Sequence, residues 1–249
     1  MRTPLLITIF VGLVLSCGRE SKVKEPSQRE LLPFESDSGW GAMDTDGEVV
    51  FVIKGAKHLG WFSEGLAPFS PDGLTYGYID TAGKVVIPAR FRSAGEFRDG
   101  MAIVEGERWG VIDMNGRYVV KPEYIAIIPA GYGLFWVRLR NAWRLVDTTS
   151  KFIGDYFMHV YPFNREGWAK VEGPGGWGVI DTAGRWIVEP KYAMVDTAVG
   201  GVFLVRDTTG WGYVRDGKVI YWRETQRLSL DSLKVAPEVK IKLSPPKIQ

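Results

Sequence analysis

Short runs in which apolar and polar residues alternate, separated by glycine-containing turns, fill most of the 249-residue chain. In residues 109–113, which read WGVID, the first, third and fifth side chains fall on one face of an extended segment, and the second and fourth fall on the other. The same five letters recur at residues 177–181. Because such runs are only five or six residues long and lie between glycine turns, helices are a poor fit. The pattern therefore predicts an all-β chain.

The WGVID segment belongs to a tandem repeat. An aromatic residue, followed in most copies by glycine, marks the same position in each copy, and successive copies of this aromatic anchor are 36, 33, 34, 34 and 34 residues apart. A fixed period of this size is typical of a chain that stacks one supersecondary unit. We therefore expect five to six three-stranded antiparallel units of about 34 residues. We also expect their cores to contain the six anchors Trp40, Tyr76, Trp109, Trp143, Trp177 and Trp211.

Two architectures explain this period. A closed propeller-like ring removes exposed strand edges and is slightly favoured, with the partial first unit completing closure. An open β-solenoid is the alternative, since the unit is short for a four-stranded blade. In either arrangement the equivalent loops of successive units line up on one face, which favours recognition of an extended or bulky partner.

The turn that follows the anchor strand has a structural explanation. It reads Asp-x-x-Gly at residues 44–47, 80–83, 113–116 and 181–184. The aspartate side chain can accept hydrogen bonds from backbone amides, and the glycine supplies the positive φ of a type I turn with a G1 bulge. These aspartates are therefore expected to shape turns and not to bind a metal.

Glycine and proline at two other repeat positions also carry structural information. Glycine after the anchor, as at Gly110, lets a neighbouring strand or ring approach the backbone closely. Proline cannot donate to a strand ladder, so we expect the third strand of a unit to end at Pro88, Pro122 and Pro190.

The N-terminus predicts export and lipidation. Residues 1–16 combine Arg2 with a short apolar run, as in a secretory signal peptide. Cys17 is the only cysteine, and residues 14–17 (VLSC) resemble the bacterial lipobox, whose cysteine carries the lipid. Gly18 replaces the aspartate that commonly retains such proteins at the inner membrane, so the resemblance favours the outer membrane. We expect a protein anchored by lipid in the bacterial cell envelope.

The chain divides into four parts by composition. A charged stretch with two prolines and no period follows the cysteine, and the anchor motif is absent after Trp222. The expected parts are a signal peptide (1–16), the lipidated cysteine with a flexible tether (17–35), the repeat domain (36–222) and a C-terminal tail (223–249).

The repeat resembles that of a known family. The WG pair, the Ile-Asp-x-x-Gly turn, the Val-x-Pro strand and a preceding Glu-Gly-x-Ala-x-Val strand recur in phase over about three quarters of the chain and are similar to the WG repeat proteins of bacteria. The resemblance implies an all-β repeat fold in secreted or envelope proteins. It implies no catalytic residue.

Composition excludes several classes of function. With 31 basic and 29 acidic residues the chain has no basic field for nucleic acid. The two histidines, His58 and His159, are far apart in sequence, and no cysteine and histidine cluster exists for zinc. We expect no cofactor, no metal and no enzymatic activity. The alternative is a hydrolase of envelope polymers, for which the best candidates are Asp155, His159, Glu166 and Glu172.

Tryptophans outside the anchor register are the best clue to a ligand-binding surface, because aromatic residues are enriched at interfaces. The residues selected are Trp136, Trp168 and Trp186. Packing on the other side of the sheets is the favoured explanation for them, because buried aromatic residues are the usual case. The expected function is a non-catalytic module that binds a protein, peptide or glycan through its repeat face. A purely structural spacer is a further alternative.

Overall fold

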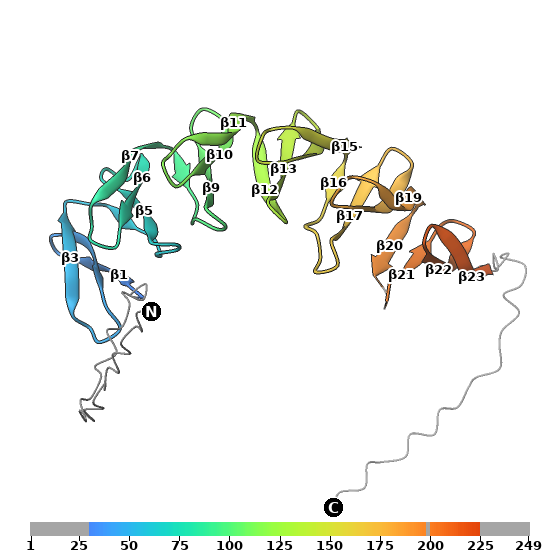
Figure 1. Cartoon of the computed structure of the whole chain (residues 1–249), viewed down its shortest axis with the longest axis horizontal. Coiled ribbons are helices and arrows are strands. Elements are labelled where there is room, and N and C mark those ends of the chain that lie inside the picture. The colour runs from blue at the N-terminus through green and yellow to red at the C-terminus, as the bar shows by residue number, and fades with distance from the viewer. Residues whose placement is uncertain (1–29, 198–199, 225–249) are drawn as a thin grey trace, which may run out of the picture.

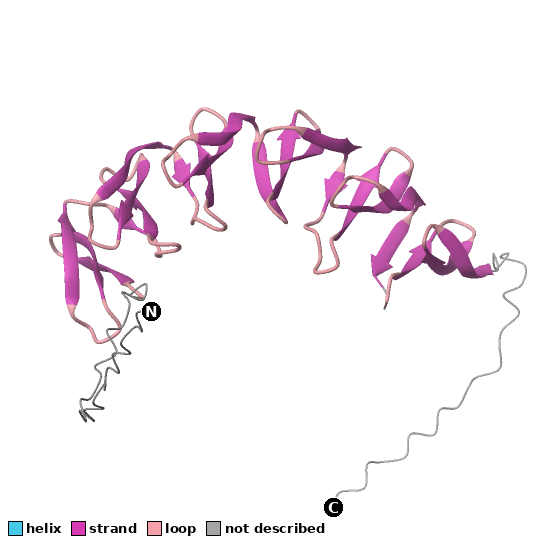
Figure 2. Ribbon diagram, viewed as in Figure 1, coloured by secondary structure: helices cyan, strands magenta, loops and turns pink. Residues whose placement is uncertain are grey.

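The computed structural model describes residues 30–197 and 200–224. The predicted signal peptide, Cys17, nearly all of the predicted tether and the C-terminal tail after Glu224 lie outside the described residues. Within them every regular element is a β-strand (Figure 2), which confirms the all-β prediction. The described part of the chain also contains no helix with the length and apolar character needed to span a bilayer.

The strands of the described residues form six antiparallel sheets, numbered 1 to 6 in chain order. Sheet 1 has three strands: β1 (Leu32–Ser36), β2 (Gly39–Met43) and β3 (Val49–Lys54). Sheet 2 is β4 (His58–Leu59), β5 (Leu66–Ser70), β6 (Tyr76–Asp80) and β7 (Val85–Phe91); sheet 3 is β8 (Ser93–Ala94), β9 (Met101–Glu105), β10 (Trp109–Asp113) and β11 (Tyr118–Tyr124). Sheet 4 is β12 (Ala126–Gly131), β13 (Leu134–Leu139), β14 (Ala142–Val146) and β15 (Phe152–Phe157). Sheet 5 is β16 (His159–Val160), β17 (Trp168–Gly173), β18 (Gly176–Asp181) and β19 (Trp186–Tyr192); sheet 6 is β20 (Met194–Thr197), β21 (Val202–Arg206), β22 (Gly210–Arg215) and β23 (Lys218–Glu224).

The six sheets follow one another along an open arc (Figure 1). Strands β9, β12, β16 and β20 lie toward its concave side, and β7, β11, β15 and β19 lie toward its convex side. Sheets 1 and 6 lie apart at the two ends of the arc, so the described residues do not form the closed ring that we favoured.

The number of strands per unit differs from the prediction. Five sheets have a fourth strand, which lies before the three predicted ones in the sequence. In three of these sheets the additional strand is only two residues long, which is too short to show an alternation of apolar and polar residues. Sheet 1, which we expected to be a partial unit, also has three strands, because Leu32–Ser36 pairs with Gly39–Met43. That strand takes residues that we expected in the tether, and its sequence, LPFES, lacks the Gly-x-Ala pattern of the other opening strands.

Face-to-face packing of successive sheets explains why both faces of the anchor strand are apolar. Val111 and Ile112 are both 0% exposed, although they point to opposite faces of β10. Ile112 packs with residues of sheet 2, and Val111 packs with residues of sheet 4. Five such buried clusters fill the five spaces between the six sheets. Burial of apolar area between sheets therefore holds the stack together.

The anchors occupy the border of these clusters and not their centres. All six anchors are half-buried. Each is the first or second residue of its strand, next to a turn, where the facing sheets end. The largest fully buried side chains lie elsewhere and include Trp136, Tyr78, Phe91, Phe97, Phe157 and Phe203. The anchor rings were expected in the core, but each is only partly buried there.

The Asp-x-x-Gly turns have the predicted hydrogen bonds. Asp113 Oδ1 accepts the amides of Asn115 and Arg117, each at 2.9 Å, and Gly116 has a φ of 77°. The hydrogen bond from the Arg117 amide is the main cause that lowers the pKa of Asp113. The turn aspartates of sheets 1, 2, 4 and 5 accept the same pair of amides. These carboxylates therefore stabilise the turns, as the sequence predicts.

Acid should destabilise the fold through such carboxylates. Asp72, in the turn between β5 and β6, accepts hydrogen bonds from the amides of Thr75 and Leu74 and from the Thr75 hydroxyl, which lower its pKa to about 2. Because the folded-state pKa lies below the unfolded value of 3.8, its stabilisation is present above pH 3.8 and is lost as the pH falls toward 2. We expect the unfolding temperature to fall less steeply in this range for Asp72→Asn than for the wild type. Parallel curves in thermal denaturation at pH 5, 4, 3 and 2 would contradict this.

Close approach of the third strand explains the glycine after the anchor. In sheet 2, Tyr76 pairs with Phe91 and Tyr78 with Ile87, so three residues of β7, including Pro88, bulge opposite Gly77. A Cβ atom on Gly77 would lie 2.4 Å from the Ile87 carbonyl oxygen. The prediction that the prolines end the third strand is wrong, because each lies in a bulge where its missing N–H leaves no ladder bond unmade, and the strand continues beyond it.

Candidate functional site

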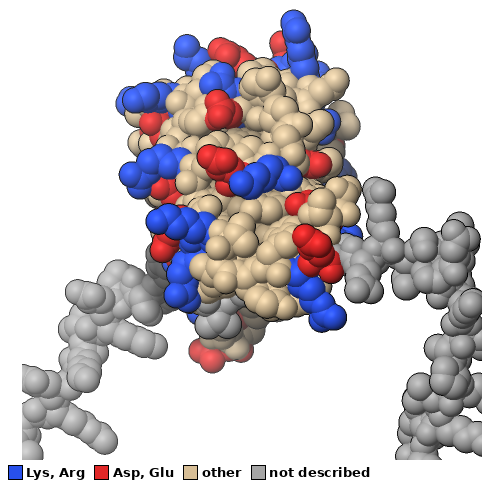
Figure 3. Space-filling model, turned by 90° about the vertical axis from the view of Figure 1, so that its right-hand side faces the viewer, with Lys and Arg blue, Asp and Glu red and all other residues tan. Residues whose placement is uncertain are grey.

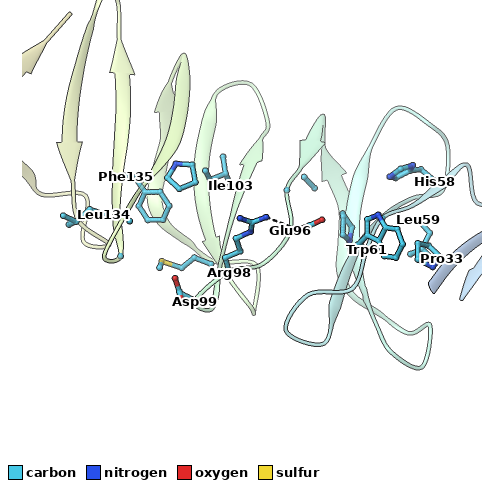
Figure 4. Close-up of a pocket in the computed structure, with 18 of the residues that line it drawn as sticks. Pro33, His58, Leu59, Trp61, Glu96, Arg98, Asp99, Ile103, Leu134 and Phe135 are labelled. Atoms are coloured by element: carbon cyan, nitrogen blue, oxygen red, sulfur yellow. Dashed lines mark hydrogen bonds and ion pairs between the residues drawn. The ribbon is translucent and has the colours of Figure 1, made fainter. Parts of the chain in front are cut away.

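A groove of about 970 Å³ crosses sheets 1 to 4. Its lining residues come from the first and second strands of these sheets and from the loops beside them. Figure 4 shows the labelled side chains in a row from Pro33 in sheet 1 to Phe135 in sheet 4. The groove therefore runs along the arc, across equivalent positions of successive units.

The groove wall between sheets 2 and 3 is fixed by hydrogen bonds. Ser63 Oγ donates to the Phe97 carbonyl oxygen at 2.6 Å. The carboxylate of Glu64 accepts the backbone amides of Asp99 and Gly100 at 2.7 and 2.8 Å. Glu64 itself has a φ of 53°, as the first central residue of a tight hairpin turn with two positive φ angles requires. These contacts join sheets 2 and 3 beside the groove.

The lining is mainly apolar. Pro33, Leu59, Pro68, Ile103 and Phe135 supply aliphatic and aromatic surface. Most of these side chains are buried or half-buried and held by the sheets on which they stand. The groove is therefore a preformed apolar surface, as ligand sites commonly are.

Trp61 is the most exposed aromatic side chain of the groove. It is 59% exposed and lies just after β4. It also lines a second, smaller cavity of about 300 Å³ beside Leu31 and Phe62. A tryptophan that is exposed between two cavities offers a large area for contact with a partner.

The charged groups of the groove lie on one short loop. Arg98 and Glu96 form an ion pair at 3.4 Å, with side chains 79% and 38% exposed. Such an exposed pair contributes little to stability, so it is free to exchange for contacts with a ligand. Asp99 stands on the same loop. The groove thus has an apolar floor and a polar rim of both signs.

His58 stands at the sheet 1 end of the groove. Its ring lies between two anchors, with centroid distances of 5.6 Å to Trp40 and 5.8 Å to Tyr76. Ring packing accounts for its position. The described residues contain no group of three or more metal-ligating side chains at this place or elsewhere.

The tryptophans selected from sequence do not line this groove. Trp136 is 0% exposed and donates from Nε1 to the Tyr161 carbonyl oxygen at 3.0 Å, so the expectation that it contacts a ligand is wrong. It lies in the interior because it fills the space between sheets 4 and 5. Trp168 and Trp186 are half-buried, with rings packed on the cores between sheets 5 and 6 and between sheets 4 and 5. Their role in binding stays a prediction.

The four candidate hydrolase residues are only partly brought together. His159 Nδ1 lies 2.5 Å from Glu172 Oε2, and the imidazole stacks on Trp177 with centroids 6.1 Å apart. Asp155 and Glu166 are exposed and make no side-chain contact with this pair. The pair itself is on the surface, with the His159 side chain 70% exposed, and it lines neither cavity described above.

Sequence reasoning passed over Trp61, although a signal was present. Phe62, Phe97 and Phe163 are equivalent residues that point into the core or its border. The residue before each of them is Trp61, Glu96 and Pro162, and the latter two are exposed. An aromatic residue at a position that is otherwise charged or proline has no core to fill. Trp61 therefore differs from the equivalent residues of sheets 3 and 5 in a way that the sequence already shows.

Comparison with known proteins agrees with the repeat. The family model described as "WG containing repeat" matches residues 76–105, 109–153 and 177–207. A search of curated proteins finds no match to this sequence.

Solved structures with a similar local arrangement are distant in sequence. A protein of unknown function from Bacteroides caccae is 15% identical, with 78% of this chain and 93% of that one covered and a TM-score of 0.29. BamB from Moraxella catarrhalis is 12% identical, with 81% and 86% covered and a TM-score of 0.39. The WD40 β-propeller domain of Doa1 is 14% identical, with 79% and 76% covered and a TM-score of 0.34. What identifies the chain is its repeated motif, and in the three matched stretches it carries the WG containing repeat.

Proposed function

We propose that this protein is a non-catalytic module that binds an extended apolar segment of a protein partner along the groove of sheets 1 to 4. The observation that carries the proposal is the exposed Trp61 ring in a preformed apolar groove that crosses four repeat units. Grooves of this kind, built by equivalent positions of stacked repeats, suit an extended ligand. The proposal includes a lipid anchor at Cys17 and an outer-membrane location, for which the support is the N-terminal sequence.

A polypeptide fits the groove better than a glycan does. Binding of a glycan would remove its hydroxyl groups from water, and each would need a hydrogen-bond partner. The floor residues Leu59, Pro68, Ile103 and Leu134 supply none from their side chains. Apolar side chains of a peptide would instead bury against them, while Arg98 and Asp99 at the rim are placed to pair with backbone or charged groups.

The hydrolase alternative has weaker support. A hydrolase site needs an acid, a base or a nucleophile held around one reacting atom and shielded from water. His159 and Glu172 meet on an open surface outside the groove. The contact of His159 with Trp177 and Glu172 is accounted for by ring stacking and hydrogen bonding.

Replacing Trp61 with alanine should weaken peptide binding by tenfold or more, because aromatic residues at the centre of an interface contribute about 2 kcal/mol or more. The test is binding of the full chain, purified in detergent, to an immobilised library of peptides rich in aromatic and aliphatic residues. The matched control is Tyr156→Ala, since Tyr156 is also 59% exposed but lies in β15 on the convex side. Equal binding by both variants, with unchanged thermal unfolding, would contradict the groove assignment. Competition by isolated envelope glycan but not by peptide would contradict the choice of ligand.

A further inference from the structure

Within residues 30–224, leaving out 198 and 199, the two ends of the stack have apolar sheet faces on which no further sheet packs. In sheets 3, 4 and 5 the third residue of the anchor segment is Val111, Leu145 or Val179, each at most 2% exposed under the next sheet. In sheet 6 the equivalent residue is Tyr213, which pairs across the ladder with Tyr221. No further sheet covers this face among the described residues, and Tyr221 is 48% exposed.

The outer face of sheet 6 is a connected group of rings. The centroids of Trp211 and Tyr213 are 6.0 Å apart, those of Trp211 and Tyr221 are 5.7 Å apart, and those of Tyr213 and Tyr221 are 6.1 Å apart. Three rings in mutual contact form a rigid surface that loses little side-chain entropy on binding. The sheet thus repeats the face that sheets 1 to 5 each bury against the next, and its Tyr213 matches Tyr78 of sheet 2.

Sheet 1 presents the opposite face at the other end of the arc. Its inner face carries Ala42, which packs against sheet 2. On the outer face, the register places Phe34 and Val52 on either side of Gly41, and Leu32 and Val49 on either side of Met43. Val49 and Val52 are 58% and 41% exposed. In sheets 2 to 6 the equivalent face is buried by the preceding sheet.

The surroundings of the two faces differ in charge. Residues 30–54 contain six acidic residues and one basic residue, Lys54, which the register places opposite Gly39 on the outer face of sheet 1. On the outer face of sheet 6, Arg206 and Arg223 pair with Trp211, and Lys218 pairs with Arg215, so the register places four exposed basic residues around the rings, with Asp196 also on this face. Figure 3 views the molecule from this end and shows uncharged surface between basic side chains, with acidic ones among them.

We propose that these faces join two copies of this chain head to tail, with the outer face of sheet 6 of one copy on the outer face of sheet 1 of the next. The contact would continue the packing that already joins each sheet to the following one five times within the chain. Two different surfaces meet in such a contact, so it is heterologous, and each copy keeps one free face for a further copy. The groove of sheets 1 to 4 would then recur along the assembly.

A pair of complementary variants tests this arrangement. Val52→Asp places a charge on the sheet 1 face, and Tyr221→Asp places one on the sheet 6 face; both residues are exposed, so the fold should tolerate the changes. The full chain in detergent is studied by analytical ultracentrifugation. The wild type should form dimers and larger species, each variant alone should be monomeric, and an equimolar mixture of the two should form dimers only, because one intact face of each kind remains.

Each other outcome overturns the proposal. A wild type that is monomeric at the highest concentration reached contradicts the proposal. A mixture of the two variants that stays monomeric also contradicts it, and this is the result expected if the two faces meet within one chain. Dimers of Val52→Asp alone would indicate contact between two sheet 6 faces. The control Tyr156→Asp should associate like the wild type, and unchanged circular dichroism shows that the variants are folded.

Discussion

Replacing Trp136 with alanine is expected to lower the free energy of unfolding by about 3 to 5 kcal/mol, the largest effect of any single substitution considered for this chain. The ring is 0% exposed and fills the space between sheets 4 and 5. It meets Phe157 edge to face with centroids 5.6 Å apart and stacks on Phe163 with centroids 6.0 Å apart. The substitution would leave a cavity in the buried cluster between sheets 4 and 5. It would also remove the donor that satisfies the Tyr161 carbonyl oxygen.

The measurement is urea denaturation followed by circular dichroism, with the midpoint and slope compared between variants. Trp61→Ala is the control, because a ring that is 59% exposed loses little burial and should cost about 1 kcal/mol or less. Equal losses for the two variants would contradict the placement of Trp136 inside the stack and Trp61 on its surface.

Replacing Gly77 with alanine should destabilise the chain by about 1 to 3 kcal/mol, although it adds only one methyl group. The added Cβ would lie 2.4 Å from the Ile87 carbonyl oxygen, 2.6 Å from the Ala89 nitrogen and 2.8 Å from the Pro88 carbonyl carbon. All three are backbone atoms of the bulge in β7, so no side chain can turn away to make room. The bulge itself must shift, and with it Ile87 and Phe91, which are buried against sheet 3.

Gly106→Ala is the matched control for this substitution. The nearest atom to a Cβ at Gly106 is the Tyr118 hydroxyl oxygen at 3.7 Å, an ordinary contact. We expect a change within about 0.5 kcal/mol in the same urea experiment. A Gly77→Ala variant as stable as the Gly106→Ala variant would mean that the glycine of the WG motif is not required by the bulge.

The repeat explains why so much of the fold could be predicted. The Asp-x-x-Gly turn occurs four times in the sequence, and glycine follows the anchor in five units, so the roles of these residues were predicted without the structure. The short strands β4, β8 and β16 were not, because two residues carry no period. The overall shape of the stack could not be predicted either, because the angle between neighbouring sheets depends on how side chains such as Phe91 and Trp136 pack together. The repeat motif does not determine this packing.

The site was harder to predict for a physical reason. A tryptophan outside the anchor register can face the next sheet or the solvent, and alternation alone does not say which, because internal sheets are buried on both faces. Trp136 faces a neighbouring sheet, whereas Trp61 lies beyond the end of a strand. Alignment of the units by Phe62, Phe97 and Phe163 places Trp61 at a position that is exposed in the other two units.

Site-specific photo-crosslinking tests the binding groove most directly. A photoreactive phenylalanine analogue at position 61 keeps an aromatic ring in the groove, and the same analogue at position 156 probes an equally exposed site on the convex side. After irradiation of host cells that produce the full chain, mass spectrometry identifies what each probe has joined. We predict that position 61 captures an apolar segment of another protein and that position 156 does not. Equal crosslinking from both positions, or none from position 61, would contradict a peptide-binding groove.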